Sequence, residues 1–262
     1  MSLTLPSAPL YDALALRYEE HFAAPHRLAY DTLAWDLCIG WLPEPPANVV
    51  DVGCGIGRWA KRLTGLGYSV LGIEPAPLMA RRARERMAND KEFRLLESRV
   101  EEVDLPAGTI DAVVAIGSLQ YTDEPADAVA RMAGWLRPGG VLAVLVDSLA
   151  ALILELVKDG RIEEANERAR ERRGVWTEGG FSADLHLMDT AQLAELCGDA
   201  GLEVVGCHGL LVGTSLLGRT RVVERLEADF AGQLEEERSA ALQPDLADLG
   251  KQLFVVARMP AR

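Results

Sequence analysis

A glycine-rich loop between an apolar strand and a helix constrains this chain more than any other feature of its sequence. The apolar run 48–52 leads into the loop Asp51–Gly57, where every second residue from position 53 is glycine, and a helical pattern follows at 58–66. Because glycine has no Cβ atom, such a loop turns sharply and lets a ligand approach its backbone closely. The helix that follows presents free N–H groups and the positive end of its dipole. The loop therefore predicts a ligand site at the carboxyl end of a strand in an α/β sheet.

Strand and helix patterns alternate along the chain. The segment 110–116 is almost entirely apolar, as is typical of a strand covered on both faces. This order predicts a mostly parallel sheet with helices on both faces. The other expected strands are 48–52, 68–73, 92–96, 141–146, 202–206 and 251–258, and the helices of the sheet are 58–66, 77–88, 125–136 and 190–200.

Additional helical segments interrupt this alternation and suggest a cap over the ligand site. The first insertion begins at the carboxyl end of a strand, where open α/β sheets bind their ligands. Both insertions pair an apolar face with a charged one. We expect the insertions and the N-terminal helices to enclose the site or, alternatively, to form a dimer interface. The predicted regions are 1–44 with two N-terminal helices, 45–147 as the core, 148–181 as a helical insertion without a strand, and 182–262 as the rest of the core. The last region includes a second helical insertion near 213–240, in which one helix is expected from Arg219 to Glu237.

Two carboxylates near the loop distinguish among the ligands that it might otherwise hold. A P-loop requires the pattern GxxxxGK[ST], which the sequence lacks, and the dinucleotide fingerprint requires glycine where this chain has Arg58. Asp51 precedes the first glycine by two residues, and Glu74 ends the second strand. A cationic ligand without phosphate, such as S-adenosylmethionine, explains both acids. Asp51 would compensate its charged methionine end, directly or through water, and Glu74 would accept hydrogen bonds from both ribose hydroxyls.

The stretch from Val49 to Arg84, VVDVGCGIGRWAKRLTGLGYSVLGIEPAPLMARRAR, resembles the first two motifs of class I S-adenosylmethionine-dependent methyltransferases. The resemblance continues through Ile110–Val114 and Leu136–Gly140, covers residues 45–147 well and extends more loosely over 184–206. It implies a Rossmann-like α/β sheet, mostly parallel with an antiparallel last strand. It also implies S-adenosylmethionine as the cofactor and S-adenosylhomocysteine as the product.

The resemblance also assigns residues to the cofactor. Relatives often carry Gly-Asp-Ala after the third strand, with the acid on the adenine amine, but here Arg99 occupies the place of the acid. The adenine contact then falls to the backbone at Arg99 and Val100 or to Glu101, which is alternatively a solvated acid at a helix start. Tyr18 is expected to close over the methionine end or, alternatively, to pack its helix on the sheet. The full expected set is Tyr18, Asp51, Gly53, Gly55, Glu74, Arg99, Val100, Glu101 and Ala115.

The acceptor side is expected around Gln120 and Tyr121, which follow the fourth strand, with Tyr11 and His21 contributed by the N-terminal helices. Alternatively, Tyr121 caps the following helix, Tyr11 packs its helix on the sheet, and His21 is exposed or caps a helix. His186, which precedes a helix of the core, is the candidate catalytic base, with a structural role as the alternative. The signatures of enzymes that act on exocyclic base amines or on cytosine C5 are missing from the sequence. The acceptor atom, whether nitrogen, oxygen or carbon, stays open because this fold serves many acceptors.

The charge of the chain argues against a nucleic-acid partner. With 40 acidic and 27 basic residues, the formal net charge is −13, and a phosphate backbone repels such a surface. We therefore expect methyl transfer to a small molecule or small peptide, as in secondary metabolism, with no nucleic-acid or membrane partner and with a homodimer as an option. The alternatives are a non-catalytic S-adenosylmethionine-binding or regulatory protein and a methyltransferase of macromolecules.

The four cysteines predict neither a metal site nor disulfide bonds. Cys38, Cys54, Cys197 and Cys207 form no CxxC pair and no cluster with histidine at zinc spacing. Reduced thiols fit a cytoplasmic protein. The sequence also shows neither a signal peptide nor an apolar run long enough to span a membrane, which supports the same expectation.

Overall fold

The fold is organised around one sheet of mostly parallel strands. In the computed structural model, which describes residues 6–261, seven strands lie in the order β3-β2-β1-β4-β5-β9-β8. β9 runs antiparallel to both of its neighbours, β5 and β8, whereas β1 to β5 pair in parallel. The predicted Rossmann-like sheet with an antiparallel last strand is therefore confirmed. The strands are Asn48–Val52 (β1), Ser69–Ile73 (β2), Phe93–Leu96 (β3), Ile110–Ile116 (β4), Leu136–Asp147 (β5), Glu203–Leu210 (β8) and Gln252–Arg258 (β9).

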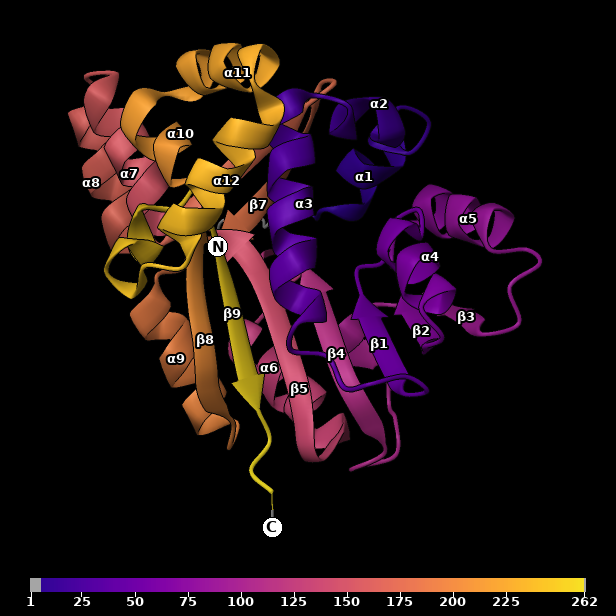
Figure 1. Cartoon of the computed structure of the whole chain (residues 1–262). Helices are drawn as coiled ribbons and strands as arrows, with labels where there is room; N and C mark the ends of the chain where they lie inside the picture. Colours follow the sequence, from indigo (N-terminus) through magenta and orange to yellow (C-terminus); the bar gives the residue numbers. More distant parts are fainter. Residues whose placement is uncertain (1–5, 262) are drawn as a thin grey trace.

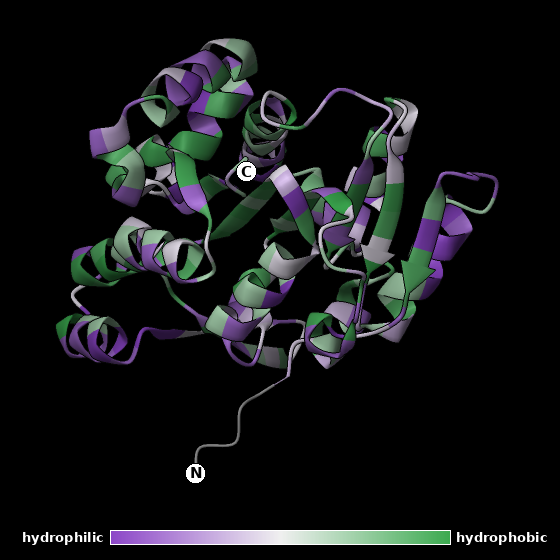
Figure 2. Cartoon of the chain, turned by 90° about the horizontal axis from the view of Figure 1, so that it is seen from below, coloured by the Kyte–Doolittle hydropathy of each residue, from purple (hydrophilic) through white to green (hydrophobic). Residues whose placement is uncertain are grey.

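Each face of the sheet has its own hydrophobic core, because successive strand residues point to opposite sides. On β1, Val49 packs with helices α3 and α4, whereas Val50 packs with α6 and α9 on the other face. Figure 2 shows the central strands mainly in the hydrophobic colour and the helices with mixed surfaces. This double burial explains why β4 lacks alternating polar residues. The helices are Pro25–Ile39 (α3), Arg58–Gly65 (α4), Pro77–Arg86 (α5), Pro125–Trp135 (α6) and Thr190–Asp199 (α9).

The remaining helices gather beyond the carboxyl ends of the parallel strands. In Figure 1, α1 and α2 lie above one half of this edge, and α7, α8, α10 and α11 lie above the other half. No helix among residues 6–261 is long and apolar enough to cross a membrane. These helices are Ala8–Leu14 (α1), Tyr18–Phe22 (α2), Leu149–Lys158 (α7), Ile162–Glu171 (α8), Val212–Leu217 (α10), Arg219–Ala228 (α11) and Phe230–Ala241 (α12).

The first insertion differs from its prediction, because the expected strand-free segment contains a β-hairpin. Strands β6 (Arg173–Glu178) and β7 (Phe181–His186) pair in antiparallel fashion after α8. They are joined by Gly179 and Gly180, whose φ angles are +57° and +82°. A two-residue hairpin turn of type I′ needs positive φ at both positions, which glycine adopts without strain. The Gly-Gly pair therefore indicates a hairpin, but the many charged residues before it led to the prediction of helix throughout this segment.

Two further boundaries differ from the predicted helices. The expected single helix from Arg219 to Glu237 is broken at Asp229, whose side chain accepts a hydrogen bond from the Gly232 N–H at 3.0 Å and so begins a new helix, α12. Before β1, the described residues form three helices rather than two, because α1 and α2 are separate short segments. Short 3-10 helices at Val100–Glu102, Leu119–Tyr121 and Pro244–Leu249 complete the connections.

Candidate functional site

The glycine loop turns tightly between β1 and α4. Gly53 and Gly55 have φ angles of +72° and +56°, in the left-handed region that favours glycine. The N–H groups of Gly53 and Cys54 donate to the Ile73 carbonyl at 2.7 and 3.1 Å, which ties the loop to the end of β2. A Cβ atom on Gly53 would overlap the side chain of Ser118. The loop is therefore packed closely against the segment that follows β4.

Glu74 fixes the loop and faces the same edge of the sheet. Its two carboxylate oxygens accept from the N–H groups of Gly55 and Ala76, each at 2.8 Å. The side chain lies at the wall of a pocket, and each oxygen keeps a further lone pair for a ligand. Because only 6% of the residue is exposed, burial raises the pKa of Glu74 to about 7, although the two N–H donors act in the opposite direction.

Asp51 is a buried acid with an unsatisfied oxygen. The residue is 2% exposed, and its Oδ2 has no hydrogen-bond partner among the described residues. Burial raises its pKa to about 7, and the nearby Glu74 carboxylate contributes in the same direction. Asp51 lines a small cavity next to the glycine loop, together with Tyr18 and Gly55. A buried anion that faces a cavity is costly unless a cation or a donor fills the space, so this position suits a ligand ammonium group.

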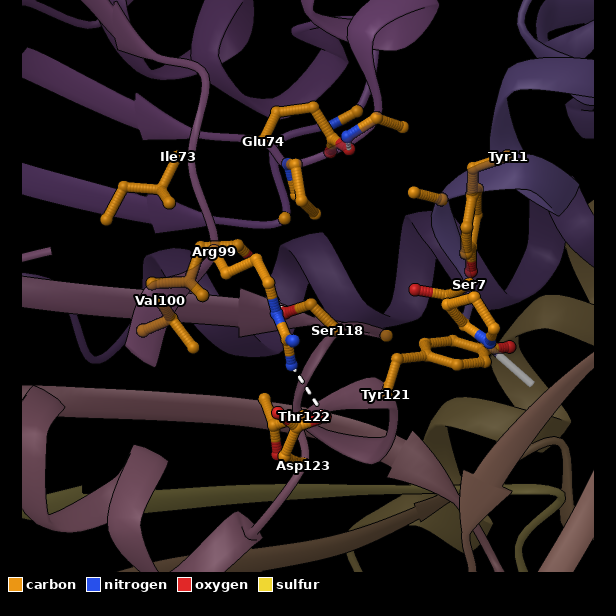
Figure 3. A pocket seen from close by; sticks show the side chains of 18 of the residues that line it. Ser7, Tyr11, Ile73, Glu74, Arg99, Val100, Ser118, Tyr121, Thr122 and Asp123 are labelled. Carbon is orange, nitrogen blue, oxygen red and sulfur yellow. Dashed lines mark hydrogen bonds and ion pairs between the residues drawn. The ribbon is translucent and has the colours of Figure 1, made fainter. Parts of the chain in front are cut away.

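A first pocket of about 190 Å³ opens beside the loop at the carboxyl ends of β1, β2 and β4. Figure 3 shows Ile73 and Val100 on one side of it, Tyr11 and Tyr121 on the other, and Glu74 at its rim. The apolar side suits an aromatic ring system, and the carboxylate suits hydroxyl groups. The pocket therefore offers the surfaces that an adenosine needs.

A second pocket of about 370 Å³ adjoins the first. The two pockets share wall residues, so a group bound at the boundary reaches both (the shared residues are Tyr11, Tyr18, Ile116, Gly117 and Tyr121). Aromatic rings surround the second pocket: the Tyr11 ring centroid lies 5.5 Å from those of Tyr121 and Trp176. Trp176, on β6, was missed at the sequence level because the hairpin that carries it was missed.

The lining of the second pocket comes from distant parts of the chain. The N-terminal helices contribute His21 and Arg27, the first insertion contributes Leu152 and Trp176, and the second contributes Arg219. The sheet provides the floor through the ends of β4 and β5. The three segments expected to form a cap therefore meet around one cavity.

Most residues expected to bind the cofactor line the first pocket. The exceptions are Asp51, which lines the adjacent small cavity, and Ala115, which is fully buried within β4, whereas its successors Ile116 and Gly117 reach the pocket. Those in the first pocket are Tyr18, Gly53, Gly55, Glu74, Arg99, Val100 and Glu101. These assignments stay predictions until a bound cofactor is observed.

Arg99 is engaged in ion pairs rather than free to contact a base. Its guanidinium lies 2.7 Å from Asp123 Oδ1, the contact drawn in Figure 3, and 3.4 Å from Glu101 Oε1. Glu101 also accepts from the Asp123 N–H at 2.9 Å. Arg99 thus connects the two loops that follow β3 and β4, where relatives often have an acid.

The residues expected on the acceptor side separate into two groups. Tyr11 and Tyr121 line both pockets, whereas His21 and Gln120 line only the second. Gln120 is fixed by Asp147: its Nε2 donates to Asp147 Oδ2 at 2.9 Å and its Oε1 accepts from the Asp147 N–H at 2.7 Å.

His186 lies on the cofactor side of the site. It lines the first pocket, not the second, and its Nε2 is 3.2 Å from the Asp123 carbonyl oxygen. Its role as catalytic base stays a prediction, and this location favours the structural alternative. Among residues 6–261, no group of three or more His, Cys, Asp or Glu residues is arranged to hold a metal ion.

Comparison with known sequences identifies the core. Residues 50–144 match the model of a family described as a methyltransferase domain. A tRNA U34 carboxymethyltransferase from Methylococcus capsulatus is 34% identical over 137 residues, which are 51% of this chain and 40% of that protein. An uncharacterized methyltransferase from Mycobacterium tuberculosis is 36% identical over 97 residues, which are 37% of this chain and 49% of that protein. The chain thus matches less than half the length of these curated relatives.

Solved structures show the same fold over nearly the whole chain. A Haloferax volcanii chain, solved in a complex with the Trm112 methyltransferase activator, has a TM-score of 0.65 and 18% identity and covers 97% of this chain and 98% of that one. A Haemonchus contortus phosphoethanolamine N-methyltransferase, in complex with S-adenosyl-L-methionine, has a TM-score of 0.59 and 16% identity, with 89% of this chain and 56% of that one covered. Residues 50–144 form a methyltransferase domain, and the chain has the fold of the class I S-adenosylmethionine-dependent methyltransferases. S-adenosylmethionine is the cofactor of this class, as the sequence predicted.

The comparisons overturn the expected partners. We expected a small molecule or peptide and no nucleic acid, with a homodimer as an option, but several relatives are named tRNA carboxymethyltransferases, and the Haloferax chain lies in a complex with a protein activator. The argument from net charge failed because it averages over the whole surface. Locally, Arg27, Arg219 and Lys251 all line the second pocket.

The raised pKa of Asp51 makes cofactor binding depend on pH. The Asp51 carboxyl, with a pKa of about 7, must be ionised to compensate an ammonium group. We expect the affinity for S-adenosylhomocysteine to fall about tenfold between pH 8 and pH 6. Calorimetric titration at several pH values measures this, and an affinity that is equal at both ends would contradict the role of Asp51.

The ligand-free protein should show the opposite dependence. A carboxyl with a raised pKa holds its proton more firmly when folded, so stability falls as the pH rises from about 4, the unfolded value, to about 7. Asp51→Asn removes this loss. The variant should therefore be more resistant to urea than the wild type at pH 8 and yet bind S-adenosylhomocysteine more weakly.

Proposed function

We propose that this protein transfers the methyl group of S-adenosylmethionine to a nucleoside of an RNA, bound in the second pocket. The observation that carries the proposal is the shared wall of the two pockets, formed by Tyr11, Tyr18, Ile116, Gly117 and Tyr121. One pocket has the surfaces for the donor, and the other is an aromatic-lined space for an acceptor.

The donor side follows from the buried acids. Asp51 would face the methionine ammonium, Glu74 would accept from the ribose hydroxyls, and Ile73 and Val100 would flank the adenine. When bound, S-adenosylmethionine supplies an electrophilic methyl group at its sulfonium. The contribution of the protein is then to hold the acceptor in line with that carbon and to exclude water.

The aromatic lining supports a planar acceptor. Tyr11, Tyr18, Phe22, Tyr121 and Trp176 all border the second pocket, and aromatic side chains stack on bases that are splayed out from single-stranded RNA. Relatives named tRNA carboxymethyltransferases support an RNA as the carrier of that base. Because the net charge is −13, contact with RNA should be confined to the mouth of the pocket and not extend along a groove.

The proposal is tested by binding and by turnover. S-adenosylmethionine or S-adenosylhomocysteine at 100 times its dissociation constant should stabilise the fold by about 2.7 kcal/mol, visible as a higher melting temperature, whereas NAD should have no effect. Label from methyl-labelled S-adenosylmethionine should appear in a tRNA pool. Trp176→Ala should reduce this turnover about tenfold or more and leave S-adenosylhomocysteine binding intact.

Two outcomes would count against different parts of the proposal. A melting temperature that responds to neither cofactor form would contradict the donor assignment. Normal cofactor binding with no label in any RNA fraction would contradict the acceptor assignment and leave the donor assignment standing.

A further inference from the structure

Two arginines from different cap segments line the second pocket without a carboxylate partner. Arg27 is on α3 and Arg219 is the first residue of α11, a helix that packs against α3. Among residues 6–261, neither guanidinium makes a hydrogen bond or an ion pair. By contrast, Lys251, which lines the same pocket, is paired with Glu155. The two arginines are thus free to bind a ligand anion.

The packing of α11 against α3 brings these two charges into the same neighbourhood. Burial lowers the pKa of Arg27, and Arg219 acts in the same direction. Both arginines also help to keep the neighbouring His26 neutral, although burial of His26 is the larger cause of its lowered pKa of about 4. Glu178 acts on Arg27 in the opposite direction, and, against the effect of burial, Arg219 lowers the pKa of Glu155, but neither carboxylate forms an ion pair with these two guanidinium groups among the described residues. A ligand anion would therefore relieve the repulsion between the two cations.

Unpartnered polar atoms in the same cavity point independently to a ligand. Thr214 Oγ1, Gln252 Oε1 and His26 Nδ1 are buried without a hydrogen-bond partner among the described residues, and all three residues line the second pocket. Thr214 is only 7% exposed. Since buried polar atoms are almost always paired, these atoms indicate a polar ligand in the pocket that Arg27 and Arg219 line.

We infer that Arg27 and Arg219 form a subsite for a phosphate group of the acceptor, with Thr214 and His26 as neutral hydrogen-bonding neighbours. Each guanidinium group can bind a phosphate through two N–H donors, so two such groups match the several oxygens of one phosphate. The N-terminus of α11 adds a favourable dipole to the Arg219 side. The inference rests on the proposed function in taking the phosphate to belong to the acceptor nucleotide.

Inorganic phosphate is the probe for this subsite. Its affinity is measured by calorimetry at constant ionic strength, with and without saturating S-adenosylhomocysteine, and acetate serves as a single-carboxylate comparison. Arg27→Gln and Arg219→Gln should each weaken phosphate binding at least about fivefold and leave S-adenosylhomocysteine affinity within about twofold. Arg221→Gln is the matched control, since Arg221 is exposed on the same helix and does not line the pocket.

The outcomes separate this inference from the proposed function. Phosphate binding that survives both substitutions, or that falls equally in Arg221→Gln, would overturn the subsite. Acetate that binds as tightly as phosphate would overturn the assignment to phosphate. Loss of phosphate binding only in Arg27→Gln and Arg219→Gln supports the subsite, even if S-adenosylhomocysteine does not bind and the proposed function fails.

Discussion

Glu74→Ala is expected to raise the dissociation constant of S-adenosylhomocysteine at least about 100-fold. Hydrogen bonds to a charged acceptor contribute about 1.5–3 kcal/mol each, and the ribose would lose two. The substitution also releases the Gly55 N–H, which Glu74 holds at 2.8 Å, so the glycine loop loses its anchor. Calorimetric titration of the variant with S-adenosylhomocysteine measures the change.

Arg99→Ala is the comparison for this prediction. Arg99 lines the same pocket, but its guanidinium pairs with Asp123 and its side chain is 41% exposed. Exposed pairs contribute about 0–1 kcal/mol. We expect its effect on cofactor affinity to stay below about fivefold. An effect of Arg99→Ala equal to that of Glu74→Ala would show that the adenosine is bound differently.

Folding must be separated from binding in Glu74→Ala, because the Gly55 and Ala76 N–H groups lose their acceptor. Glu74→Gln keeps one acceptor oxygen and should be more stable than Glu74→Ala. Its side-chain NH2 group would face one of the two backbone N–H donors, so one hydrogen bond is still lost. Binding is measured well below the melting temperature of each variant. The order wild type, Glu74→Gln, Glu74→Ala in affinity is the expected result.

The mostly parallel sheet and the glycine loop could be predicted because their physical causes are local in sequence. A strand covered on both faces is almost entirely apolar, as β4 is apart from Asp111 near its start, and a loop that folds back with positive φ requires glycine at Gly53 and Gly55. Acids placed directly at strand ends, such as Asp51 and Glu74, appear in the sequence at the positions where the sheet presents them. These features need no knowledge of distant contacts.

The acceptor side could be predicted only in part because it is assembled from distant segments. Tyr11, Trp176 and Arg219 meet around one cavity, and no spacing in the sequence connects them. Trp176 was within reach, since the Gly179-Gly180 pair signals a hairpin whose alternate residues face one side. The placement of Arg27 and Arg219 around the same pocket depends on how α11 packs against α3. It has no signature in the sequence.

Gly53→Ala should be among the most damaging single-atom additions in the chain. A φ of +72° is unfavourable for alanine by about 1–2 kcal/mol. The new Cβ would also overlap Ser118, whose hydroxyl is held by a hydrogen bond of 2.5 Å to the Val52 carbonyl, so it cannot easily move away. Overpacking of this kind costs typically 1–3 kcal/mol more. Urea unfolding of the ligand-free variant should therefore show a loss of about 3 kcal/mol, together with weakened S-adenosylhomocysteine binding.

Gly108→Ala separates the two causes. Gly108 has a similar φ of +68°, but a Cβ there would meet no atom within 4 Å. The free energy of unfolding of Gly108→Ala should fall only by the cost of the positive φ angle, about 1–2 kcal/mol. The cofactor affinity of this variant should be unchanged because Gly108 lies outside the first pocket. Equal losses of stability in the two variants would mean that Ser118 moves aside at no cost. The segment after β4 would then be mobile, and the close packing of the glycine loop against Ser118 would not be what holds the first pocket in shape.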